Sequence, residues 1–135
     1  MALIARRQIS PERVVAICTA GDSVGNFVCL TDAGGGPISV ESVDITNGAK
    51  IPRFGVIVLK INPTSCVVQV SGVVDGYSGL TPGKVHYVDF DSTPTALPPA
   101  PTIGSPRVYI NAVGIAVDST RIFLKDDITP SVRIL

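Results

Sequence analysis

Few side chains in this sequence could act as a nucleophile, a general base or a metal ligand, and His86 is the only histidine. A serine nucleophile needs a base that takes its proton and an acid that orients the base, and Ser78, His86 and Asp89 contain these three groups. Ser78 is not part of a G-x-S-x-G nucleophile elbow, and no glycine motif for an oxyanion hole accompanies the three residues. Since their spacing does not require them to meet, we expect a protein that is not an enzyme.

Two other patterns could be read as binding sites for phosphate or metal. Residues 34–36 are three glycines, but no G-K-[ST] sequence follows and no helix begins there to direct its amide groups at an anion. The acidic pairs Asp89/Asp91 and Asp126/Asp127 lack the D-x-D-x-D-G spacing of a calcium loop. We therefore expect a turn and solvated carboxylates, with no metal site and no cofactor.

The cysteines Cys18, Cys29 and Cys66 are odd in number and show no C-x-x-C spacing. Each lies in an apolar run, and a single histidine adds little to a zinc site. We expect buried, reduced thiols that pack as small hydrophobic side chains.

Strands must position these side chains, because helix signals are nearly absent. No apolar period of 3.6 residues continues beyond two turns. Short apolar runs between turn-forming residues predict eight strands, at 14–19, 26–30, 39–44, 55–61, 66–74, 85–90, 108–117 and 122–124. The turns at 62–65 and 118–120 each predict a hairpin between the neighbouring runs. The predicted fold class is all-β, a small sandwich or barrel of about eight strands.

A pattern that occurs twice suggests that the β fold is duplicated. The segment that begins at Gly21 lines up with the one at Gly79, an offset of 79 − 21 = 58. The hairpin strand at Gly55 lines up with the one at Gly114, an offset of 114 − 55 = 59. We expect one β domain over residues 14–125, built from two pseudo-repeated β units at about 14–74 and 75–125.

Three segments lie outside the repeated strands. Residues 91–106 contain five prolines and are expected to form an extended surface strap that cannot join a sheet ladder, because proline has no amide hydrogen. Residues 1–13 are expected to form an extended N-terminal arm, and residues 126–135 a C-terminal tail. Both ends contain apolar residues, which suggests that they dock on a neighbour.

The composition disfavours some classes of partner. Eleven Lys and Arg balance eleven Asp and Glu, so no long-range field attracts nucleic acid or an anionic membrane. Only 16% of residues are charged and 45% are hydrophobic, which suggests that apolar surface meets other subunits. The N-terminus does not resemble a secretory signal, and no apolar run approaches the ~20 residues of a membrane helix. We expect a protein made in the cytoplasm that stays soluble or joins an assembly.

Several motifs resemble small structural proteins of tailed bacteriophages. Residues 66–74 (CVVQVSGVV), 79–87 (GLTPG, then a tyrosine) and 113–117 (VGIAV), together with the Pro-rich strap, are similar to a pattern of head decoration, or cement, proteins. Some tail-fibre and baseplate modules share this pattern. With residues 21–25 and 52–57 the resemblance extends over about 14–125 and leaves out the terminal arms. It implies an all-β module that often works as a trimer on a virion surface.

The function implied by this resemblance is that of a capsid decoration protein made in the host cytoplasm. It would bind the outer surface of a phage head as a homotrimer and stabilise the capsid against internal pressure. Its partners would be the major capsid protein and other copies of itself, with no nucleic acid and no membrane. The expected contact residues lie in the two arms and are Leu3, Ile4, Arg6, Arg7, Val132, Ile134 and Leu135.

The alternative is a receptor-binding module of a tail fibre or baseplate. In that case the loop tips would carry the ligand site. We expect Tyr77, in a glycine-flanked turn, to be an exposed contact residue, together with the strap at 91–106.

Overall fold

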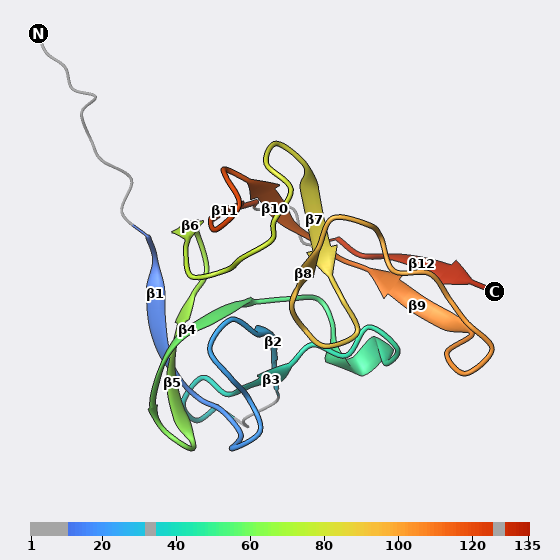
Figure 1. Cartoon of the computed structure of the whole chain (residues 1–135). Coiled ribbons are helices and arrows are strands. Elements are labelled where there is room, and N and C mark those ends of the chain that lie inside the picture. Colours follow the sequence, from blue (N-terminus) through green and yellow to red (C-terminus); the bar gives the residue numbers. More distant parts are fainter. Residues whose placement is uncertain (1–10, 32–34, 126–128) are drawn as a thin grey trace, which may run out of the picture.

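The computed structural model describes residues 11–31, 35–125 and 129–135, and almost all of its regular structure is strand (Figure 1). A single 3-10 turn, η2 (Gly48–Lys50), is the helical element within these ranges. The strands in chain order are β1 (Arg13–Ile17), β2 (Phe27–Leu30), β3 (Val40–Ser42), β4 (Gly55–Asn62), β5 (Ser65–Gln69), β6 (Gly72–Val74), β7 (Val85–Val88), β8 (Pro94–Thr95), β9 (Arg107–Ile110), β10 (Ala112–Ala116), β11 (Ile122–Leu124) and β12 (Ser131–Ile134). The prediction of an all-β fold is confirmed.

Two five-stranded antiparallel sheets have the same strand order. The first sheet runs β1-β5-β4-β2-β3, and the second runs β6-β11-β10-β7-β8. Each strand of the second sheet therefore occupies the position of one strand of the first, in the same order along the chain. This shared topology confirms the two pseudo-repeated β units that the sequence offsets predict.

The eight expected strands are all present, but two of them are divided. The run 66–74 breaks after Gln69, and Gly72 restarts it with a φ of 86° as β6. Because β6 pairs with β11 in the second sheet, the second unit begins at Gly72 and not after Val74. The run 108–117 breaks at Asn111 into β9 and β10, which belong to different sheets.

The first sheet curls around a core of its own. A parallel bridge between Ile17 and Ser39 joins its two edge strands, and the amide of Ile17 donates to the carbonyl of Ile38 at 2.8 Å. The side chains inside this curl are small or medium in size, and they are Ala16, Cys18, Val28, Val40, Ile57, Cys66 and Val68.

A second core lies between the two sheets. Phe27 and Val56 of the first sheet pack there with Val88, Ile122 and other residues of the second. This core covers only the part of the first sheet's outer face that lies over β2 and β4. Beyond this cover, Gln69 of β5 is buried and donates to the Val73 carbonyl of the second sheet, whereas Val15 of β1 is 66% exposed.

The proline-rich strap and the C-terminal segment both contain a paired strand. Within the strap, β8 pairs with β7 through Tyr87↔Thr95 and Val88↔Pro94, so the expectation that the strap forms no ladder is wrong for this short piece. Proline is tolerated there because β8 is an edge strand. The C-terminal strand β12 pairs with β9, and this ribbon extends away from the sheets on the side opposite β1 (Figure 1).

Candidate functional site

His86 does not form a catalytic triad. Its ring is 1% exposed, with Nδ1 2.9 Å from the carbonyl oxygen of Lys84 and Nε2 3.3 Å from the amide nitrogen of Thr81. Because the carbonyl only accepts, Nδ1 carries the proton and Nε2 accepts from the amide. Ser78 lies exposed in a loop, and the carboxylate of Asp89 accepts the amide of Phe90 at 2.8 Å. The imidazole therefore fixes the turn that precedes β7.

Residues 21–25 read Gly-Asp-Ser-Val-Gly, which is the G-x-S-x-G spelling of a nucleophile elbow. An elbow places its serine between a strand and a helix, whereas this segment joins β1 to β2. Ser23 and Asn26 close the turn, since the Ser23 amide donates to Asn26 Oδ1 at 2.8 Å and the Asn26 amide donates to the Ser23 carbonyl at 3.1 Å. The geometry is that of a tight turn in the connection between two strands that do not pair with each other.

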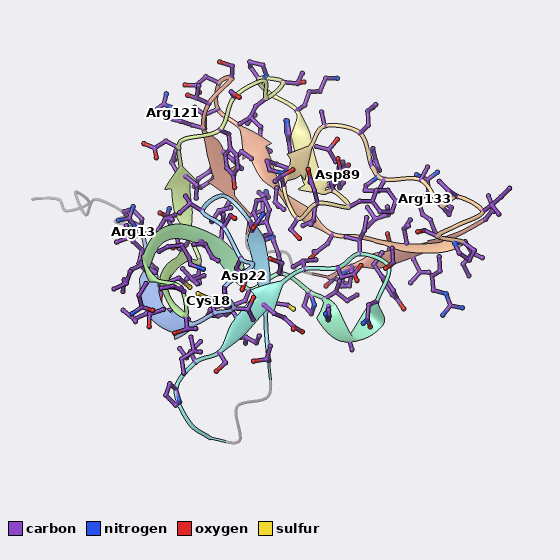
Figure 2. The ribbon with its side chains drawn as sticks, turned by 60° about the horizontal axis from the view of Figure 1, so that its bottom comes forward. Arg13, Cys18, Asp22, Asp89, Arg121 and Arg133 are labelled. Carbon is purple, nitrogen blue, oxygen red and sulfur yellow. The ribbon has the colours of Figure 1, made fainter. Side chains whose placement is uncertain are left out.

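Asp22, labelled in Figure 2, is the centre of a polar cluster in the first unit. One carboxylate oxygen accepts the Thr19 amide at 2.8 Å, and the other accepts the Ser42 hydroxyl at 2.6 Å. Lys60 Nζ donates to three backbone carbonyls around it, those of Thr19, Asp22 and Pro63, at 2.9 to 3.1 Å. The cluster joins the β1–β2 loop to β3 and to the β4–β5 hairpin.

We expect the Asp22 cluster to make stability depend on acid. Burial raises the pKa of Asp22, but the hydrogen bonds from Ser42 and Thr19 outweigh it and hold the pKa below 3.8. A group with a lowered pKa in the folded state stabilises above its unfolded pKa and loses this contribution as pH falls through the folded one. The unfolding free energy should therefore fall below about pH 4, and Asp22→Asn should flatten this part of the curve in urea titrations at stepped pH. An unchanged slope in the variant would contradict the assignment.

The three cysteines are buried and reduced, as expected. Burial, followed by the nearby Glu41, raises the pKa of Cys29 to about 11. Burial and the neighbouring Cys18 thiol raise the pKa of Cys66 to about 12. Both groups are therefore protonated at neutral pH, and the thiolate is the reactive form.

Thiol labelling should report directly that the three cysteines are buried and unreactive. In the native protein at pH 8, a disulfide reagent should modify none of the three cysteines during the minutes in which it modifies all three in denaturant. The count of released chromophore per chain measures the difference. Rapid labelling of one native thiol would show a reactive cysteine that the packing does not predict.

The described part of the chain contains neither a cluster of metal-ligating residues nor a helix that could span a membrane. No group of three or more His, Cys, Asp or Glu residues there could hold a metal ion. Asp126 and Asp127 lie outside the described residues, as does Gly34. The described helical turn is far too short to cross a membrane.

The C-terminal contact residues lie on the β9–β12 ribbon. Their exposed fractions are 49% for Val132, 65% for Ile134 and 68% for Leu135. Backbone bonds hold the ribbon in place, since Leu135 donates to Pro106 at 2.8 Å and Tyr109 donates to Ile45 at 2.8 Å. The N-terminal candidates Leu3, Ile4, Arg6 and Arg7 lie outside the described residues.

A pocket of about 520 Å³ opens beside this ribbon. It is lined by Thr46, residues 104–107 and Ile134. Arg133, labelled on the same ribbon in Figure 2, reaches back to the carbonyl of Pro99 at 3.4 Å. The pocket thus joins the strap to the C-terminal strand.

Tyr77 is not an exposed contact residue, and that expectation is wrong. Its ring stacks on Phe27 with centroids 6.4 Å apart, and its hydroxyl donates to the Gly25 carbonyl at 2.9 Å. Burial raises its pKa far above the usual range. The flanking glycines indicated a flexible turn, but the ring is used to join the loops of the two units.

Two rows of apolar side chains, which the sequence analysis did not single out, cross the outward faces of the sheets. On the second sheet, register places Val73, Phe123, Ile115 and Val85 side by side across four strands. We call this the outer row. Phe123 is 48% exposed between the buried Ile122 and Leu124. The sequence contains a signal for this row, because three successive apolar residues in a strand must make both faces of the sheet apolar at that point.

On the first sheet, register places Val15, Val67 and Leu59 side by side. Val15 is 66% and Leu59 55% exposed, while Val14 and Ala16 on either side of Val15 pack in the core inside the first sheet. A groove of about 350 Å³ adjoins this row and is lined partly by Val24, Val67 and Leu59.

No known protein-family model, curated protein or solved structure matches this chain.

Proposed function

We propose that this protein is a non-enzymatic decoration protein that binds the outer surface of a tailed-phage head and stabilises it. Support comes from the motif resemblance at 66–88 and 113–117 and from one structural observation. The β9–β12 ribbon presents Val132, Ile134 and Leu135 to solvent, while Val108 of β9 anchors it in the core between the sheets; the ribbon itself is visible in Figure 1. An exposed apolar ribbon is unfavourable in water unless a partner covers it.

The ribbon is suited to gripping a capsid lattice because it is already ordered. Its register with β9 and the bond from Leu135 to Pro106 fix the backbone before binding. A preordered contact loses less conformational entropy than a flexible tail does. In a homotrimer, three such ribbons would bind together, so that contacts that are individually weak give high avidity.

Co-sedimentation with capsids assembled without the protein tests the proposal. The wild-type chain should saturate the capsid surface, and Ile134→Lys should weaken this binding by at least tenfold, because it places a charge in the contact. The matched control is Ile103→Lys, since Ile103 is 92% exposed and lies outside the ribbon. Wild-type protein that does not sediment with capsids would overturn the proposal.

The pocket beside the ribbon favours a second candidate, a receptor-binding module of the phage tail. The strap and Ile134 line a concavity of about 520 Å³, large enough for a small ligand. This candidate predicts binding to host cells, and Pro106→Lys should reduce that binding while capsid binding remains absent.

A further inference from the structure

We infer that the outer row of one copy packs on the first sheet of a second copy. It would cover the row formed by Val15, Val67 and Leu59 and the groove beside that row. The inference rests on the proposed function only for the number of copies, which is three. It assigns the surface through which the copies meet.

The first observation is that the second sheet covers only part of the first. Val56 and Val58 of β4 pack into the core between the sheets, but Leu59 remains 55% exposed on the same strand. The groove lies at this boundary, where Val74 and Asp75 at the end of β6 line one side. The exposed part of the first sheet is therefore a face that a second apolar sheet could cover.

The second observation is that the same chain carries such a face. The members of the outer row are neighbours across adjacent strands, and Val73, Phe123 and Val85 are 41%, 48% and 42% exposed, while Ile115 is half-buried. The row contains no charged side chain, and it crosses four strands, about 14 Å at the usual spacing. Phe123, near its centre, is the only aromatic ring among the four side chains.

Both rows remain partly exposed within one chain, and a second copy offers an apolar face to each of them. A contact between two different faces is head-to-tail, and a head-to-tail contact closes into a ring when its rotation allows. The rows would form the dehydrated centre of the interface, whose standard size is about 800 Å² per partner. Phe123 would enter the groove as the central contact.

Charge favours a second copy over a strongly charged partner. The chain has a formal net charge of zero, so copies do not repel at long range. The groove has Arg13 and Asp75 in its wall, and the outer row is bordered by the exposed Lys125 at the end of β11. A head-to-tail contact can therefore place Asp75 of one copy near Lys125 of the next.

Two single substitutions and their mixture test the pairing. Phe123→Lys removes the central ring and leaves the groove intact, whereas Leu59→Lys blocks the groove and leaves the ring intact. Each variant alone should sediment near the 14.0 kDa of one chain, and the wild type at three times that mass. The dissociation constant should rise by at least about 30-fold, the effect of a 2 kcal/mol hot spot.

An equimolar mixture of the two variants should form a dimer of one chain of each kind. Only one intact contact is then possible, between Phe123 of the Leu59→Lys chain and the groove of the Phe123→Lys chain. Leu97→Lys is the matched control, since Leu97 is 77% exposed in the strap, and it should remain a trimer. Unchanged far-UV circular dichroism should show that each variant is folded.

The outcomes separate this inference from the decoration proposal. A wild-type monomer that saturates capsids would overturn the interface and leave the decoration function standing. A trimer that ignores capsids and depends on Phe123 would support the interface and overturn the decoration function. Trimers that persist in Phe123→Lys, or a mixture that stays monomeric, would overturn the head-to-tail pairing.

Discussion

Gly114→Ala is expected to lower the unfolding free energy by about 3 to 4 kcal/mol, because the new methyl group has no room. A Cβ at Gly114 would lie 2.0 Å from the carbonyl oxygen of Phe123, and that oxygen belongs to the backbone of the next strand. The residue also has a φ of 154° and lies where the pairing of β10 with β7 shifts register. Either the two strands must separate or the ladder must break.

Urea-induced unfolding followed by circular dichroism measures this effect. Gly104→Ala is the matched control, since a Cβ there meets nothing within 4 Å, and it should change stability by less than about 0.5 kcal/mol. If Gly114→Ala is within 1 kcal/mol of the wild type, the close approach of β10 and β11 is not as described.

The same crowding explains why glycine marks both halves of the repeat. Gly55 is the counterpart of Gly114 in the first unit, and a Cβ there would lie 2.6 Å from the carbonyl oxygen of Gln69. The sequence shows that the two glycines share an offset, but it does not show why glycine is needed. That reason lies in a neighbouring strand and becomes visible only when the strands are paired.

Local patterns predicted most of the fold. Alternation and turn residues located eight strands and both hairpins, since these depend on neighbours in the chain. They did not locate β8 and β12. β8 contains a proline, and β12 is stabilised by β9, more than 20 residues away, so neither carries a strong signal of its own.

The candidate site was predicted less well, because exposure is a property of the folded chain. Tyr77 looked exposed between two glycines, yet it packs against Phe27, which lies 50 residues earlier. Val132, Ile134 and Leu135 were predicted as contact residues from their position at an apolar end, and they are exposed. The outer row needed the register of four strands before its members could be seen as neighbours.

Arg53 is a further residue whose role the sequence conceals. A single arginine before a strand usually lies on the surface, but Arg53 is 2% exposed and among the largest buried side chains. Asn111 of the second unit lies 111 − 53 = 58 positions later, within one position of the offset of 59 between Gly55 and Gly114. The amide of Arg53 donates to Oδ1 of Asn111 at 2.7 Å, so nearly equivalent positions of the two units bond to each other.

Arg53→Met should therefore cost about 2 to 4 kcal/mol of stability, because it removes a buried guanidinium and leaves two partly buried carbonyl acceptors without their donors. Nε of Arg53 donates to the Ala112 carbonyl at 2.9 Å, and Nη2 donates to the Lys125 carbonyl. Both acceptors belong to the second unit, so the guanidinium joins the first sheet to the second. Methionine replaces the aliphatic stem of arginine but supplies no hydrogen-bond donor, which limits the loss of packing while it removes the polar contacts.

Graded variants distinguish this role from simple loss of a charge. Arg121→Met removes an exposed arginine that pairs with Asp118 at 2.7 Å, and it should change stability little, because solvent screens surface ion pairs. Asn111→Ala removes only the acceptor for the Arg53 amide, because Nδ2 of Asn111 has no partner among the described residues, and it should fall between the two. If Arg53→Met and Arg121→Met cost the same in urea titrations, the guanidinium does not hold the two units together.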